Sequence, residues 1–289
     1  MSLTASESSE LFRNEPDAFL DVGAGEVAYR RVGRGPDVLF VHGWPASGAT
    51  FRKLLPYLSM SFTCHLIDLP GAGSSRFDRT TPLSIDQHIK TVRSVVDLLD
   101  LRDVAVVGHD SGGLIARHAF AADPRVRSWV LIDTEQPHGL SLRFRSFLAA
   151  RHIPGIGGGL GWVSGRTRLR RTRLVFGDIF CDPSLIDGEF NEFFLEPLRT
   201  LSDRRAAAVK VLRSFDVQRV EELGGLHQQI NVPVQLIWGD RDPFFPISWA
   251  KEMVGTFPVA KLSTIRDASL FCHEERPAEI SEVMLSALA

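Results

Sequence analysis

The stretch that decides the fold is Val106-Val107-Gly108-His109-Asp110-Ser111-Gly112-Gly113. Its apolar beginning predicts a buried β-strand, and the glycines that follow predict a sharp turn into a helix. Glycines two positions on either side of a central residue relieve crowding in such a turn, so the central side chain stands exposed at the sheet edge. That frame is centred on Asp110. Centring it on Ser111 would place His109 where the first small residue belongs, so a central serine fits less well.

An aspartate at the apex of this turn has a chemistry different from that of serine. A carboxylate nucleophile attacks carbon and leaves an alkyl ester, whereas a serine hydroxyl carries out acyl transfer. The stretch therefore predicts Asp110 as a nucleophile whose reaction passes through an ester.

Short apolar runs alternate with helical patterns along much of the chain. Six of them are expected to be buried strands: residues 37–41, 62–67, 103–108, 127–132, 233–238 and 260–265. Ser84 with Gln87 three residues later forms a capping-box signal, which predicts a helix over 84–100. Residues 19–22 and 26–32 are expected to form two short antiparallel edge strands. The pattern predicts an α/β fold with a mostly parallel sheet flanked by helices.

The alternation breaks between residues 136 and 226, and we interpret this segment as an inserted, mainly helical cap. The core would then comprise residues 1–135 and 227–289. The glycine-rich run 154–161 is expected to be a mobile loop and not a stable helix, and it lacks a phosphate-loop pattern. The cap also carries a run of arginines that could hold an acidic substrate but is more typical of a solvated face: Arg166, Arg168, Arg170, Arg171 and Arg173.

The bulk composition excludes some classes of partner. With 289 residues and 44% hydrophobic content, the chain is long enough for a sizeable core. The 33 basic and 35 acidic residues nearly balance, so we expect no nucleic-acid or membrane partner. We expect a small-molecule substrate, water as co-substrate and a possible homodimer. No motif calls for a cofactor or a metal.

The cysteines and the first residues bear on location. Cys64, Cys181 and Cys272 are odd in number and show no C-x-x-C spacing, which predicts a reducing, cytoplasmic environment without disulfides or a zinc site. The first eighteen residues are polar and lack the layout of a signal peptide, so a loose arm is expected there.

Several short motifs occur in a characteristic order. They are HGWP at 42–45, DLPGAGSS at 68–75, GHDSGG at 108–113, WGDRDPFFP at 238–246 and HEERP at 273–277. Together they resemble the α/β-hydrolase superfamily, and within it the epoxide hydrolase and dehalogenase branch. The resemblance extends over nearly the whole chain and implies an α/β-hydrolase fold with a cap.

The resemblance also implies an oxyanion hole. In the family it is formed by the backbone N–H of the third residue of HGxP and that of the residue after the nucleophile, here Trp44 and Ser111. The Trp44 ring is expected to line the pocket, and its indole N–H could donate to a leaving group. His42 is expected to orient the loop and not to transfer a proton.

The supporting acid has two candidates. The family's G-x-x-D frame after the strand ending at Trp238 selects Asp242, and Asp240 is expected to serve the turn. Asp133 is the alternative, because some similar dehalogenases take their acid after the preceding strand. The resemblance favours Asp242.

The base is where the chain departs from the family. Relatives place a catalytic histidine about seven residues before a proline that opens the last helix, and this count from Pro277 falls on Leu270. A leucine cannot activate water. His273 is the nearest imidazole, and it could serve only if the loop takes an unusual path. Because general-base help is typically worth ~10²–10⁴-fold, the ester should accumulate if no base is present.

The substrate signatures of the branch are incomplete. Epoxide hydrolases of this branch use cap tyrosines as acids, but Tyr29 and Tyr57 lie outside the cap. Haloalkane dehalogenases bind the halide with a tryptophan directly after the nucleophile, and other dehalogenases carry arginines one and four residues after it. In this chain those positions hold Ser111 and Leu114. Candidate cap donors are Trp162, His138, His152 and His227. The motif wording favours an epoxide hydrolase. A dehalogenase, a catalytically impaired ligand-binding homologue and a serine esterase using Ser111 remain alternatives.

Overall fold

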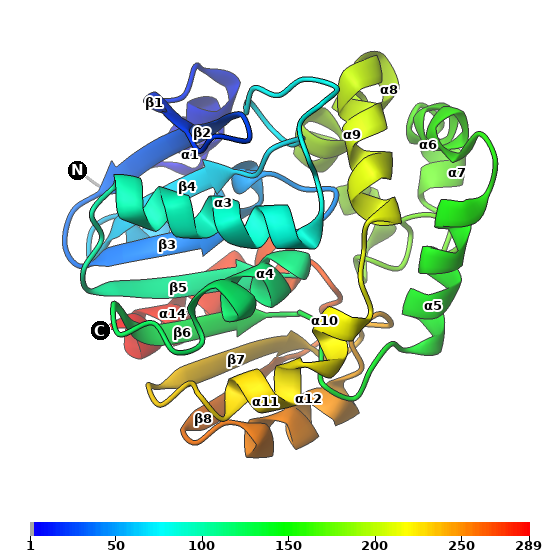
Figure 1. Cartoon of the computed structure of the whole chain (residues 1–289). Helices are drawn as coiled ribbons and strands as arrows, with labels where there is room; N and C mark the ends of the chain where they lie inside the picture. Colours follow the sequence, from blue (N-terminus) through cyan, green and yellow to red (C-terminus); the bar gives the residue numbers. More distant parts are fainter. Residues whose placement is uncertain (1–2) are drawn as a thin grey trace.

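The computed structural model describes residues 3–289, which form one eight-stranded sheet with helices on both faces (Figure 1). The strands are β1 (Ala18–Asp21), β2 (Glu26–Gly33), β3 (Asp37–Val41), β4 (Thr63–Asp68), β5 (Val104–His109), β6 (Val126–Ile132), β7 (Val234–Gly239) and β8 (Ala260–Ile265). All six predicted central strands are confirmed to within one residue at either end, as is the mostly parallel sheet.

The order of strands in the sheet is β1-β2-β4-β3-β5-β6-β7-β8. The first two strands pair antiparallel with each other, and β2 also pairs antiparallel with β4, which confirms the predicted antiparallel edge. From β4 to β8 every pair is parallel. The carboxyl ends of β3, β5, β6, β7 and β8 therefore lie along one edge of the sheet, where α/β proteins commonly place their sites.

Alternate residues of the central strands point to opposite faces of the sheet. In β3, Leu39 and Val41 join one buried cluster, and Val38 and Phe40 join the other. Because both faces are covered, the strands read as continuous apolar runs in the sequence.

The helices, in chain order, are α1 (Ala5–Arg13), α2 (Leu55–Leu58), α3 (Ile85–Leu98), α4 (Ser111–Phe120), α5 (Leu142–Ala149), α6 (Ile156–Ser164), α7 (Thr167–Arg170), α8 (Glu196–Thr200), α9 (Ser202–Arg213), α10 (Gln218–Glu221), α11 (Leu223–His227), α12 (Ile247–Met253), α13 (Cys272–Glu275) and α14 (Pro277–Leu288). Helices α3 and α4 cover one face of the sheet, and α2 and α14 cover the other (Figure 1). The predicted helix is confirmed as α3, and one half of the predicted capping box is present, because Ser84 Oγ accepts the Gln87 N–H at 3.2 Å.

Two expectations about local structure were wrong. The amino-terminal arm contains α1, whose first turn is held by a capping box between Thr4 and Glu7, a signal already visible in the sequence. The glycine-rich run is largely helical in α6, which packs against α8 and α9. Tertiary packing outweighs the low helix propensity there. At Gly161 a Cβ would lie 3.2 Å from the Leu198 carbonyl oxygen, so the small residue permits the close approach.

The segment between β6 and β7 is mainly helical. Its helices α5 to α9 lie beyond the carboxyl ends of the strands (Figure 1), whereas α11 packs against α4 on the sheet. Among residues 3–289, no helix has both the length and the apolar character needed to cross a membrane.

Candidate active site

The turn between β5 and α4 places Asp110 at its apex. Asp110 has a φ of 50° and a ψ of −139°, a strained conformation that residues other than glycine rarely adopt. A Cβ on Gly108 would lie 2.6 Å from the Gly113 Cα, and one on Gly112 would lie 2.2 Å from the Val41 carbonyl oxygen. The glycines of the frame are therefore required by backbone packing around the aspartate.

The carboxyl of Asp110 is held by backbone donors. Its Oδ2 accepts the Trp44 N–H at 2.8 Å, and the Ser111 N–H also favours the ionised form. Burial raises the pKa of Asp110 well above its usual range, and the charge of Glu135 raises it further. The two predicted oxyanion residues thus lie at the carboxyl of the predicted nucleophile.

His42 holds the loop that carries Trp44. One ring nitrogen, Nδ1, lies 2.9 Å from the Gly43 carbonyl oxygen, and Nε2 accepts the Leu69 N–H at 2.9 Å. Burial lowers the pKa of His42, so the imidazole is neutral with its hydrogen on Nδ1. This geometry matches the loop-orienting role expected from the sequence.

The ring of Trp44 lines the cavity beside Asp110, but its indole N–H is already used. That N–H donates to the Ala208 carbonyl oxygen of α9 at 2.9 Å. The expectation that it could donate to a leaving group therefore does not hold in this structure. The bond instead ties the loop that carries Trp44 to the helical segment.

A small cavity of about 50 Å³, the Asp110 cavity, lies between the sheet edge and the helical segment. Aromatic and aliphatic side chains make most of its wall: Trp44, Pro45, Ile85, Phe144, Phe147, Leu148, Val175, Phe176, Ile179, Val211, Leu212, Phe215, Phe244, Leu270 and Phe271. The remaining lining residues are Asp110, Ser111 and Glu135. A second cavity of about 220 Å³ adjoins it through Trp44 and Ser111 and has a more polar wall.

The two candidate acids lie together. Oδ1 of Asp242 accepts the Phe244 and Phe245 N–H groups at 2.7 and 3.1 Å, and burial raises the pKa of Asp242 to about 8. Oδ1 of Asp133 accepts the Gly239 N–H at 3.0 Å. Burial and the nearby charge of Asp242 raise the pKa of Asp133. Within residues 3–289, Oδ2 of Asp242 has no well-aligned hydrogen-bond donor.

Asp240 lies outside this pair, in the turn. Its Oδ1 accepts the Asp267 N–H at 2.9 Å, which is the turn role expected from the sequence.

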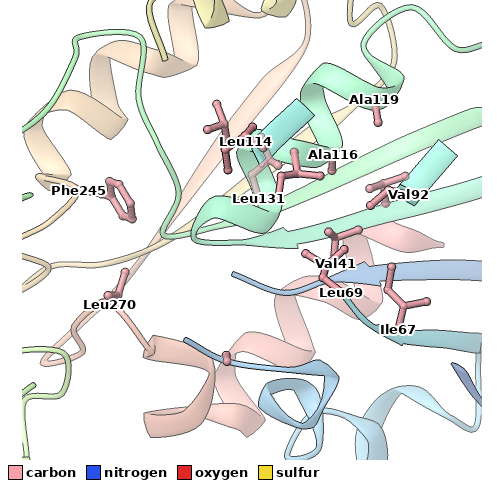
Figure 2. Packing of buried hydrophobic residues seen from close by; sticks show 14 of the residues in the cluster. Val41, Ile67, Leu69, Val92, Leu114, Ala116, Ala119, Leu131, Phe245 and Leu270 are labelled. Carbon is pink, nitrogen blue, oxygen red and sulfur yellow. The ribbon is translucent and has the colours of Figure 1, made fainter. Parts of the chain in front are cut away.

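Leu270 reaches the Asp110 cavity, whereas His273 does not. Figure 2 shows Leu270 near Phe245 at one end of the packed apolar cluster. The loop is tied down at Leu270, whose carbonyl oxygen lies 2.9 Å from Nε2 of the buried His109. Phe271 N–H donates to the Ile179 carbonyl oxygen. The loop is therefore held by backbone contacts and carries a leucine at the position where the family resemblance led us to expect a base.

His273 lies on α13 and points away from the cavity. Its Nε2 lies 2.8 Å from Thr50 Oγ1, and its ring packs against Phe51 and His109. It is fully buried, and burial lowers its pKa to about 3. This geometry does not favour the prediction that His273 is the base, because its ring contacts Thr50 and does not line the Asp110 cavity.

The other candidate donors are also engaged elsewhere. His138 pairs with Glu252 at 3.0 Å, and Arg117 lies against Nε2 of His227 at 2.9 Å. Arg166 lies over the exposed Trp162 ring, and Arg151 donates to His152. The Tyr29 hydroxyl lies 2.7 Å from His65, and Tyr57 is exposed. None of these side chains lines the Asp110 cavity in the part of the chain that the structure describes.

Glu135 is the residue that the sequence interpretation missed. It follows the carboxyl end of β6 by three positions and is 1% exposed in the wall of the Asp110 cavity. The signal was present, because a charged residue shortly after a buried strand is expected at this edge of the sheet.

Two arginines of the arginine run form ion pairs within the helical segment. Arg170 and Arg171 both pair with Asp187, and Arg170 also donates to Asn191 at 2.7 Å. Neither arginine lines the Asp110 cavity.

Comparisons with known proteins agree with this architecture. A family model described as alpha/beta hydrolase fold matches residues 36–277. An uncharacterized hydrolase of Bacillus subtilis (strain 168), YugF, is 26% identical over 255 residues, 88% of this chain and 90% of that protein. A pimeloyl-[acyl-carrier protein] methyl ester esterase of Chromobacterium violaceum is 28% identical over 246 residues, 82% of this chain and 88% of that protein.

Solved structures show the same fold. The haloalkane dehalogenase DbeA from Bradyrhizobium elkani has a TM-score of 0.79 at 19% identity, with 93% of this chain and 96% of that chain covered. The epoxide hydrolase CorEH has a TM-score of 0.73 at 20% identity, with 95% and 96% covered. At such identities the likeness shows the fold alone. With the match of the family model over most of its length, the chain belongs to the α/β-hydrolase fold family.

Proposed function

We propose that the protein is a hydrolase in which the Asp110 carboxylate attacks a carbon atom of a small, apolar epoxide and forms an alkyl ester. The observation that carries this proposal is the position of Asp110 at the apex of the turn, with Oδ2 accepting the Trp44 N–H in an apolar cavity. A carboxylate in this position is a nucleophile toward saturated carbon.

The backbone donors suit both steps of such a reaction. They hold Oδ2 while the other oxygen, Oδ1, attacks the substrate. In the ester, Oδ2 is the carbonyl oxygen, and it carries the negative charge when water adds to the Asp110 carboxyl carbon. The same Trp44 and Ser111 N–H groups can then stabilise that charge.

The wall of the cavity favours an uncharged, apolar substrate. We assign residues 136–226 as the cap, because this segment supplies Phe144, Phe147 and Val211 to the wall. No lysine or arginine of residues 3–289 lines the Asp110 cavity, so a substrate carboxylate would have no counter-charge there.

An epoxide is favoured over a halide. A halide leaves as an anion and needs N–H donors, but the Trp44 indole N–H is bonded to Ala208 and Ser111 follows the nucleophile. Opening an epoxide produces an alkoxide held on the substrate itself, which needs a proton donor instead.

Two alternative functions are each suggested by a separate observation. Leu270 favours a ligand-binding protein that forms an ester and releases it slowly. The esterase named among the relatives suggests acyl-ester hydrolysis through Ser111, but no imidazole of residues 3–289 lines the Asp110 cavity to activate that hydroxyl.

The test is the intact mass of the protein after incubation with terminal epoxides and 1-haloalkanes. We expect an added mass equal to the whole epoxide, or to the alkyl group of the haloalkane less the one hydrogen that it replaces, and peptide mapping should place it on Asp110. No adduct and no turnover across the panel would contradict the proposal. Labelling of Ser111 by a fluorophosphonate would instead support the esterase.

A further inference from the structure

Glu135 has no part in the chemistry described so far, although it shares the cavity of Asp110. Acidic side chains are almost never fully buried unless they are paired. Oε1 of Glu135 is buried, and within residues 3–289 it has no hydrogen-bond partner. An unpaired buried oxygen of this kind calls for a physical explanation, such as a ligand or a proton.

Thr134 can serve Glu135 in both protonation states. Its Oγ1 lies 2.8 Å from the Asp110 carbonyl oxygen and 3.0 Å from Glu135 Oε2, but a hydroxyl has one hydrogen to donate. When Glu135 is ionised, that hydrogen can go to Oε2. When Glu135 is neutral, the hydrogen can go to the Asp110 carbonyl, and Glu135 can donate to Oγ1.

The charges around Glu135 also allow its carboxyl to change protonation state. The buried Arg117 of α4 donates to Thr134 Oγ1 at 2.9 Å and to the Glu135 carbonyl oxygen at 2.8 Å, so a cation lies near the carboxyl. His227 of α11 accepts from Arg117 and is neutral, because burial lowers its pKa to about 2. Asp110 supplies the opposing negative charge across the cavity.

Because these effects oppose one another, the carboxyl groups of Asp110 and Glu135 can share one proton. Burial raises the pKa of Glu135, while Arg117 lowers it. The charge of Glu135 raises the pKa of Asp110, so ionisation of one carboxyl opposes ionisation of the other. The Trp44 and Ser111 N–H groups favour the charge on Asp110, and the state that reacts with an epoxide is the one in which the shared proton lies on Glu135.

We propose that Glu135, buried in the Asp110 cavity with Oε1 unpaired, is the acid–base catalyst of the reaction in the place of the missing imidazole. This inference rests on the proposed function of Asp110. Among the side chains of residues 3–289 that line the cavity, Ser111 is the one protic group besides the two carboxyls and the Trp44 indole, which is already bonded.

The steps balance as follows. Asp110 Oδ1 forms a bond to an epoxide carbon, the ring C–O bond breaks, and the alkoxide takes the proton of Glu135. Glu135 is then a carboxylate, and it takes a proton from water while the hydroxide adds to the Asp110 carboxyl carbon. The tetrahedral intermediate loses the alkyl oxygen, which takes the hydroxyl proton. A diol leaves, Asp110 is again a carboxylate and Glu135 is again protonated.

The experiment compares two reagents on the full-length protein, 1,2-epoxybutane and 1-bromobutane, by time-resolved intact mass. Glu135→Gln should slow ester formation from the epoxide by about 10²-fold or more, because the alkoxide loses its proton donor. Alkylation by 1-bromobutane should change much less, since bromide leaves without a proton. Glu252→Gln, at an exposed glutamate, is the matched control and should leave both rates unchanged.

Hydrolysis of the ester is followed after excess 1-bromobutane is removed. The butyl ester of Glu135→Gln should persist about 10²-fold longer than that of the wild type. In Glu135→Ala, added formate should shorten the lifetime by supplying a carboxylate. A purely structural role for Glu135 would show neither this rescue nor a difference between the two reagents.

The dependence on pH provides a further readout. Ester formation from the epoxide needs Asp110 ionised and Glu135 protonated, so its rate should rise and then fall with pH. Glu135→Gln should lose the alkaline fall. Equal slowing of both reagents, or no slowing, would overturn the role of Glu135 while leaving Asp110 as nucleophile. The absence of any adduct on the wild type would overturn the proposed function, and this inference with it.

Discussion

The turn around Asp110 and the loop around Leu270 face the same cavity, but they differ in what constrains them. At the turn the backbone leaves no space, since a Cβ on Gly112 would meet the Val41 carbonyl oxygen at 2.2 Å. At the loop the backbone is held through the Leu270 carbonyl oxygen and His109, while the Leu270 side chain only contributes to the apolar wall.

The turn and the loop therefore place different requirements on the residues that they can hold. The turn keeps its residues because the path of the chain depends on them. The residue at position 270 can change without altering that path, because the loop is anchored by backbone contacts. A leucine at position 270 is therefore compatible with an intact turn at Asp110 and with the Trp44 N–H that donates to its carboxyl.

The largest expected effect comes from removing the nucleophile. Asp110→Asn keeps the shape of the side chain, and asparagine tolerates a positive φ, so the fold should persist. Ester formation should fall by at least about 10⁴-fold, as expected when a covalent nucleophile is removed. Intact mass after incubation with 1-bromobutane measures this. An unchanged adduct would place the reactive group elsewhere.

A histidine introduced at position 270 tests whether this loop position can hold the base. Leu270→His places a histidine on the anchored loop in the wall of the Asp110 cavity, where it can activate water. Hydrolysis of the ester should accelerate by ~10²–10⁴-fold, measured as the lifetime of the butyl ester. Leu270→Gln, which adds polarity without a base, is the control. Equal lifetimes for the two variants would contradict an open base position at residue 270.

His273 should affect stability and not chemistry. His273→Ala leaves the Thr50 hydroxyl without its buried partner, so the free energy of unfolding should fall by about 1–3 kcal/mol in urea denaturation. Ester formation and hydrolysis should keep their rates at a temperature where the variant is folded. A selective loss of ester hydrolysis would restore His273 as the base.

The last prediction concerns the pair of Asp133 and Asp242. The pKa of Asp242 is raised from 3.8 to about 8, so the folded state binds a proton that the unfolded state releases, and stability falls as the pH rises through that interval. Asp242→Asn removes this titration. Its melting temperature relative to wild type should therefore rise by several degrees between pH 5 and pH 8. A difference independent of pH would show that Asp242 is charged in the folded protein at both values.

Local patterns in the sequence were sufficient to predict most of the strands of the sheet. The strands β3 and β5 are buried on both faces, so they appear in the sequence as continuous apolar runs. The glycines around Asp110 indicate a sharp turn, because the backbone there has no space for a Cβ. The glycine-rich run of α6 was misread, because its helix depends on packing against α8 and α9, which are distant in the sequence.

By itself, the sequence determined the strand order along the chain, the turn at Asp110 and the absence of an imidazole at residue 270, because these follow from neighbouring residues. Tertiary structure decided three other points. It brought Asp133 beside Asp242, turned His273 toward Thr50 and buried Glu135 in the cavity of Asp110. Those positions depend on how strand ends and loops from separate parts of the chain meet at one edge of the sheet, which no local pattern specifies.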